Sequence, residues 1–140
     1  MNSVKAYQVY QQNQVFTAPQ EKLVTMLYDG ALRFINQAKQ GIEEKDIEKA
    51  NQNFIKAQRI LAELMGNLDR SVGEVAENLF SVYDYMYRSL VEANIKKDGE
   101  KAQEIYDMLK ELRDTWVQAT KQVPNPASAS PGPGLNLKSE

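Results

Sequence analysis

The sequence predicts an all-α fold, an antiparallel four-helix bundle, and three observations carry this prediction. Apolar residues recur at helical spacing in four blocks between Leu23 and Val117. Short polar breaks separate the blocks, which favours antiparallel neighbours. Residues that cap helix N-termini stand before the blocks. We therefore expect one bundle over residues 17–123, preceded by an N-terminal lead segment over 1–16 and followed by a disordered Pro-, Gly- and Ser-rich tail over 124–140.

The first helix is predicted over residues 18–43. Thr17 and Gln20 form a capping box, in which each side chain bonds a backbone amide of the other residue. Pro19 falls in the first turn, where its missing N–H costs nothing. We assign the core stripe of this helix to Leu23, Leu27, Phe34 and Ala38. A second apolar stripe lies beside it and consists of Val24, Tyr28, Ala31 and Ile35.

The second and fourth helices are predicted over residues 47–69 and 99–121. Asp46 stands before the second helix and Asp98 before the fourth. A carboxylate at this position accepts hydrogen bonds from the free amides of the first turn. The core stripe of the second helix is Ala50, Phe54, Ala57, Leu61, Leu64 and Leu68. That of the fourth is Ala102, Ile105, Leu109, Leu112 and Trp116.

The third helix is predicted over residues 73–96 and opens on a second capping box, formed by Ser71 and Glu74. Its core stripe is Ala76, Leu79, Tyr83, Met86 and Leu90. Further apolar residues widen the stripe to an arc of about 180° on a helical wheel. A helix in a small bundle keeps a solvent face, so we expect part of this surplus to form an exposed apolar groove of the kind that marks a partner site.

The composition excludes most catalytic and metal-binding classes. The 140 residues include no His and no Cys, which removes the common zinc sites, di-iron bundles built on Glu-x-x-His, and nucleophiles activated by His. We therefore expect no catalytic residue, no metal and no cofactor, and the chain is predicted not to be an enzyme.

Charge and hydropathy restrict the partners. The net charge of −2 comes without a basic stripe, so nucleic acid is not an expected partner. No apolar run approaches the roughly 18 residues of a membrane span, so we expect no membrane insertion. The N-terminus lacks an apolar signal core and the chain lacks cysteine, and both features favour a cytoplasmic location.

Apolar residues beside the core stripes are the candidates for partner binding. Core packing explains any one of them, because a bundle helix with two neighbours needs a wide apolar face, but it does not explain the whole set. Tyr7 and Tyr10 in the lead segment either dock in the groove when no partner is bound or belong to a free terminus. The candidate set is Tyr7, Tyr10, Tyr28, Ile55, Ile60, Phe80, Tyr87, Val91, Tyr106 and Val117.

Several short motifs follow one another in an order that is specific, although each motif alone is common. They are Y-x-x-Y-Q-Q-N from Tyr7, T-A-P-x-x-x-L from Thr17, M-L-Y-D-G-A from Met26, L-x-x-x-Y-D-Y-M from Leu79, L-V-x-A-N from Leu90, and Trp116 late in the fourth helix. This pattern resembles the FliS family of bacterial flagellar secretion chaperones over about residues 5–123.

The resemblance implies a function that agrees with a surplus of apolar surface. Chaperones of this family are antiparallel helical bundles that bind the disordered C-terminal segment of flagellin in the cytoplasm. They prevent premature filament polymerisation and present flagellin to a component of the flagellar export gate. Their N-terminal segment can cover part of the binding surface in the free state. The alternative is a structural or regulatory bundle that forms a homodimer through the same groove.

Overall fold

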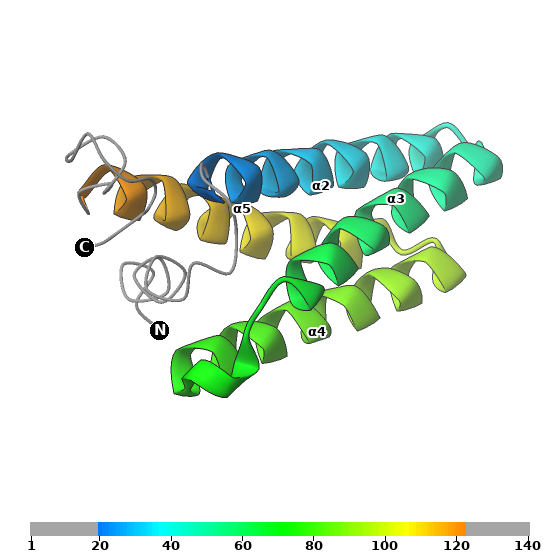
Figure 1. The fold of residues 1–140 in the computed structure, drawn as a ribbon. Coiled ribbons are helices and arrows are strands. Elements are labelled where there is room, and N and C mark those ends of the chain that lie inside the picture. Colours follow the sequence, from blue (N-terminus) through cyan, green and yellow to red (C-terminus); the bar gives the residue numbers. More distant parts are fainter. Residues whose placement is uncertain (1–19, 123–140) are drawn as a thin grey trace.

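The computed structural model describes residues 20–122, which form four α-helices and one short 3-10 helix (Figure 1). The helices are α2 (Gln20–Glu43), α3 (Ile47–Gly66), α4 (Glu74–Lys96) and α5 (Gly99–Gln122), and the 3-10 helix η1 (Arg70–Val72) lies between α3 and α4. This part of the chain contains no strand, which confirms the all-α prediction. The lead segment, the capping box at Thr17 and the tail lie outside the described residues.

The four helices are arranged as a ring in which each helix packs against two others. α2 packs against α3 and α5, and α4 also packs against α3 and α5. Short turns join helices that follow one another in sequence, so these neighbours run antiparallel as predicted (Figure 1). α3 begins beside the C-terminal end of α2 and then moves away from it toward α4 (Figure 1).

Two of the turns between helices share one design. Lys45 and Lys97 adopt left-handed backbone conformations, with φ of 59° and 52°. In each turn the amide of this lysine and that of the next residue bond back to carbonyls of the preceding helix, which is the Schellman pattern. The next residues, Asp46 and Asp98, accept hydrogen bonds from the amides of Lys49 at 3.0 Å and Lys101 at 3.1 Å. The structure thus confirms both predicted aspartate caps.

The turn between α3 and α4 differs from its prediction. α3 ends at Gly66 rather than at residue 69. Ser71 does not cap α4, because its amide and its hydroxyl both bond the carboxylate of Asp69, at 3.1 and 2.6 Å. Gly73, with φ of 131°, stands before α4 and provides no side-chain cap. The second capping box is therefore wrong, since an aspartate closer in sequence to Ser71 holds its polar groups.

One edge of α2 carries two glycines where α3 packs against it. A Cβ at Gly41 would lie 2.7 Å from the backbone nitrogen of Ala50 and 3.0 Å from its Cα. A Cβ at Gly30 would lie 3.1 Å from Cδ1 of Ile60. Gly30 and Gly41 are about three turns apart and share one edge of the helix. This glycine edge lets the backbone of α3 come close to α2 beside the turn.

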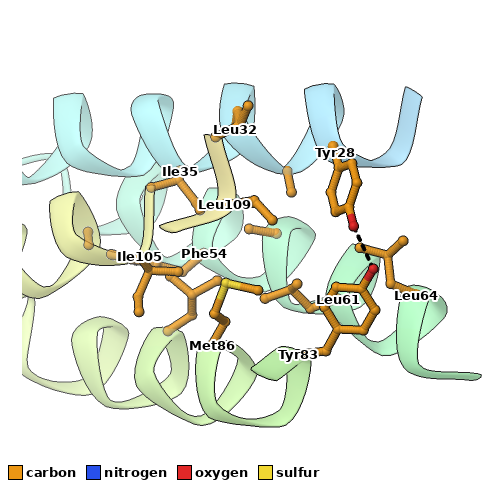
Figure 2. Packing of buried hydrophobic residues seen from close by; sticks show 14 of the residues in the cluster. Tyr28, Leu32, Ile35, Phe54, Leu61, Leu64, Tyr83, Met86, Ile105 and Leu109 are labelled. Carbon is orange, nitrogen blue, oxygen red and sulfur yellow. Dashed lines mark hydrogen bonds between the residues drawn. The ribbon is translucent and has the colours of Figure 1, made fainter. Parts of the chain in front are cut away.

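The core fills the centre of the ring and takes large side chains from all four helices (Figure 2). The predicted stripes of α3, α4 and α5 are buried, apart from Leu68 and Leu112, which are half-buried. The predicted stripe of α2 is wrong. Leu23 is 37% exposed and Leu27 and Phe34 are half-buried. The buried residues of α2 are instead Val24, Tyr28, Ala31, Leu32, Ile35 and Ala38.

We expect Gly41→Ala to destabilise the protein and Gly66→Ala to have the opposite effect. An added methyl group at Gly41 meets the backbone of α3, and overpacking of this kind costs about 1–3 kcal/mol. At Gly66 a Cβ has no atom within 4 Å and the backbone φ is not positive, so alanine should raise the free energy of unfolding by up to about 1 kcal/mol. Urea unfolding followed by circular dichroism measures both. Equal stability of the two variants would contradict the close approach.

Candidate partner-binding surface

Tyr28 lies in the core and not on an exposed groove. Its side chain is 3% exposed, and its hydroxyl lies 2.7 Å from the hydroxyl of Tyr83. This hydrogen bond crosses the bundle from α2 to α4 (Figure 2). Burial raises the pKa of Tyr28 to about 12, and the hydrogen bond to Tyr83 opposes part of that rise. The sequence placed Tyr28 among the candidates for partner binding, and this placement is corrected. The stripe of α2 that contains Tyr28 faces the centre of the ring, whereas the stripe that contains Leu23 and Phe34 does not.

Ile60 occupies the contact between α2 and α3. Its side chain is half-buried, packs against the core, and lies against the notch that Gly30 leaves in α2. We therefore assign Ile60 first to packing between these two helices. Tyr7 and Tyr10 lie outside the described residues.

Four candidates gather along the line where α3 meets α4. Nδ2 of Asn94 on α4 donates a hydrogen bond to Oδ1 of Asn51 on α3 at 2.9 Å. This bond shows which edge of each helix faces the other. Ile55 follows Asn51 by about one turn on α3, and the other three precede Asn94 by about one, two and four turns on α4. We call these residues the α3–α4 seam: Asn51, Ile55, Phe80, Tyr87, Val91 and Asn94. Its four apolar side chains are all half-buried.

Arg70 of η1 covers one end of the α3–α4 seam. Its guanidinium carbon lies 3.8 Å from the centroid of the Phe80 ring, within the range of a cation–π contact. The same guanidinium bonds the carboxylate of Glu77 at 3.1 Å. Both charged side chains are about half exposed, so this pair contributes little to stability and a partner could displace it at low cost.

Tyr106 and Val117 lie on a different line, where α5 meets α2. Arg113, which falls between them on the same edge of α5, bonds Asp29 of α2 at 2.9 Å. Lys39 of α2 lies 5.7 Å from the centroid of the Tyr106 ring and also bonds Gln103. This α2–α5 seam and the α3–α4 seam are on opposite sides of the ring of helices. The candidate residues of α3, α4 and α5 therefore fall on two separate seams.

The large apolar side chains with most exposure fall outside the candidate set. They are Leu23, Met26, Ile47, Tyr85 and Ile95, and Met26 and Ile95 are 67% and 77% exposed. Met26, Ile47 and Ile95 were not among the candidates, although Ile95 follows Val91 by one turn on α4. Leu23 was assigned to the core. Tyr85 was outside the predicted apolar arc, and its hydroxyl donates to Glu104 of α5 at 3.0 Å.

Within residues 20–122, no three acidic side chains gather as a metal site would require. No helix in the same range combines the length and the apolar character that a membrane crossing needs.

Comparison with known proteins gives a consistent result. A family model described as Flagellar protein FliS matches residues 3–123. The flagellar secretion chaperone FliS of Bacillus subtilis is 47% identical over 113 residues, which cover 81% of this chain and 84% of that protein. The protein of the same name from Salmonella typhimurium is 33% identical over 120 residues, 84% of this chain and 89% of its own length.

A solved structure supports the same fold. It is described as a flagellar chaperone from bacteria, and it superposes with a TM-score of 0.70 at 19% sequence identity. The superposition covers 85% of this chain and 98% of the other.

We expect Tyr28→Phe to flatten the loss of stability at alkaline pH. Tyrosine in an unfolded chain titrates near pH 10, and Tyr28 in the folded protein near 12, so its contribution is complete below about pH 10 and is lost as pH rises toward 12. Between about pH 8 and pH 11 the wild type should lose about 1.4 kcal/mol more than the variant. Urea unfolding at both pH values measures this difference, and parallel losses would show that Tyr28 titrates normally.

Proposed function

The chain belongs to the FliS family of flagellar secretion chaperones, and on this premise we propose that it binds the disordered C-terminal segment of flagellin. In the cytoplasm this binding would prevent premature filament polymerisation, and the complex would deliver flagellin to the export gate. The relatives are named as chaperones, a non-enzymatic class, and the chain is not an enzyme. The observation that supports the proposal is the α3–α4 seam, where four apolar side chains are only half-buried and stand in one line.

The shape of the seam suits a segment that folds as it binds. From Phe80 to Asn94 the seam runs about 20 Å along α4, since an α-helix rises about 1.5 Å per residue. An amphipathic helix that places apolar residues at every third or fourth position can lie along a line of this length. Tyr87 combines an apolar ring with a hydroxyl that can remain in contact with water, a combination common at protein interfaces.

The energetics require the client to extend beyond this seam. Ordering a disordered segment costs about 2–5 kcal/mol or more, and removing a half-buried side chain from water returns only about 1 kcal/mol at 25 cal/mol per Å². Four side chains barely offset that cost. We therefore propose that flagellin also reaches the α2–α5 seam, where Tyr106 and Val117 lie, and wraps around the bundle.

The lead segment, residues 1–16, is proposed to compete for part of this surface in the free protein. It carries Tyr7 and Tyr10 among polar residues, so it is apolar enough to dock weakly and polar enough to leave.

We expect Ile55→Asp and Tyr87→Asp to weaken flagellin binding more than they weaken folding. A carboxylate on the seam would have to lose water against an apolar client surface, and we expect at least a tenfold loss of affinity, about 1.4 kcal/mol. Titration calorimetry with a flagellin C-terminal peptide measures affinity, and circular dichroism measures helix content.

Tyr85→Asp is the matched control for Tyr87→Asp. Both tyrosines belong to α4, but Tyr85 bonds Glu104 on the side of α5. We expect this control to bind within threefold of the wild type. Equal losses at the two tyrosines would mean that the seam is not the binding surface, and outright unfolding of the Tyr87 variant would place that side chain in the core.

We expect amides around Tyr7 and Tyr10 to be partly protected from hydrogen exchange in the free protein and to lose protection when flagellin binds. Displacement of the lead segment by the client gives this change. Exchange mass spectrometry with and without the flagellin peptide provides the measurement. Full exchange in both states would remove the competing role of the lead segment and leave the role in flagellin binding intact.

A further inference from the structure

Two cationic side chains lie over a half-buried aromatic ring on the outer face of α2 and α3, and a third cation follows on α3. The guanidinium carbon of Arg33 lies 5.0 Å from the centroid of the Phe34 ring, and Nζ of Lys56 lies 5.4 Å from it. Lys56 belongs to α3, so the ring joins the two helices through cation–π contacts. Arg59 follows Lys56 by three residues on the same side of α3. We call Arg33, Phe34, Lys56 and Arg59 the cationic patch.

Within the described residues, none of the three cations belongs to a salt bridge. The reason lies in the residues one turn away. Asp29, which precedes Arg33 by four positions, bonds Arg113 of α5 at 2.9 Å. The corresponding neighbours of Lys56 are Gln52 and Ile60, which carry no charge. Glu63 follows Arg59 by four positions, but no salt bridge within the described residues joins the two.

The other outer faces of the bundle differ from this one. On α4, Arg88 and Lys96 each pair with an acidic residue one turn away, and on α5 Lys110 does the same. The chain as a whole carries a net charge of −2. Positive charge is therefore concentrated on the outer face of α2 and α3. All three cationic side chains are exposed, and within the described part of the chain none of them is held in a salt bridge, although Glu63 lies one turn from Arg59.

We propose that the cationic patch docks an acidic segment of a partner protein, at a surface centred on the boundary of α2 and α3 that adjoins the α3–α4 seam at Arg59. Carboxylates of such a segment would pair with Arg33, Lys56 and Arg59, and arginine can hold a carboxylate through two parallel hydrogen bonds. The exposed part of the Phe34 ring would receive an apolar side chain that lies beside those carboxylates. This inference does not depend on flagellin being the client.

The terminal segments of the given sequence do not supply the complementary charge, so the partner we propose is another molecule. Residues 1–19 contain no Asp or Glu, and Glu140 is the single acidic side chain in residues 123–140. Nucleic acid is a poorer fit, since tight binding to phosphates rests on a longer series of cations than these three.

Fluorescence anisotropy with two labelled peptides tests the proposal. One peptide is built from Glu, Ala and Leu, and the other replaces each Glu by Gln. We expect the wild type to bind the Glu peptide at least fivefold more tightly than the Gln peptide, because exposed charge pairs are individually weak but three of them act together. Raising the salt concentration should reduce the difference.

Two variants of equal net charge separate the patch from a general charge effect. Arg33→Gln, Lys56→Gln and Arg59→Gln together should abolish the preference for the Glu peptide. Arg88→Gln, Lys96→Gln and Lys110→Gln together remove as much charge from α4 and α5 and should leave the preference intact. Circular dichroism checks that the variants are folded. If the first triple variant unfolds, Lys56→Gln alone is used in its place, because this side chain is exposed, and it should reduce the preference for the Glu peptide.

Four results would overturn the proposal. They are equal binding of the two peptides, equal losses in the two triple variants, tighter binding of a uridine oligonucleotide than of the Glu peptide, and conversion of a dimer to a monomer by the patch variant. The third would identify a site for nucleic acid, and the fourth a contact between two copies of this chain.

Discussion

The close contact between α2 and α3 along the glycine edge is the constraint on which the rest of the architecture depends. Because Gly41 has no side chain, the backbone of Ala50 can approach α2 beside the turn, and Gly30 then accepts Ile60 further along. Once this edge of α2 faces α3, the stripe that contains Tyr28 and Ile35 must face the centre of the ring. Phe34 is left half-buried at the boundary between the two helices, where cations from both reach its ring.

Polar contacts hold the other helices to this pair. The hydroxyls of Tyr28 and Tyr83 bond each other across the core, and each satisfies a group that would be costly to bury alone. At one end of the bundle Nε1 of Trp116 donates to the carbonyl of Glu21 at 3.1 Å, which fixes α5 against the start of α2. These hydrogen bonds form only when the helices are correctly shifted along their axes relative to one another. Apolar packing alone fixes this axial register less strictly.

Local features of the fold were predictable from the sequence, and features set by neighbouring helices were not. The helices and the caps at Asp46 and Asp98 depend on residues a few positions apart, so spacing and residue type sufficed. The prediction chose the wrong apolar stripe of α2 as the core stripe. A helical wheel shows that a helix has two neighbouring apolar stripes but does not show which of them faces the other helices. The same limit explains why the sequence did not show that Ile55 and Tyr106 belong to opposite seams. Family membership was predictable because it rests on the order of motifs rather than on packing.

The shared design of the turns at Lys45 and Lys97 has a consequence for the rate of folding. Each turn is closed by hydrogen bonds among residues adjacent in sequence, and an aspartate next to the lysine starts the following helix. The chain thus contains two helical hairpins, α2 with α3 and α4 with α5, whose contacts are largely local. Low average separation of contacting residues goes with folding in microseconds to milliseconds. The turns therefore close between residues near one another in sequence, whereas the contacts that join the two hairpins, such as that of Tyr28 with Tyr83, bring together residues far apart in the chain.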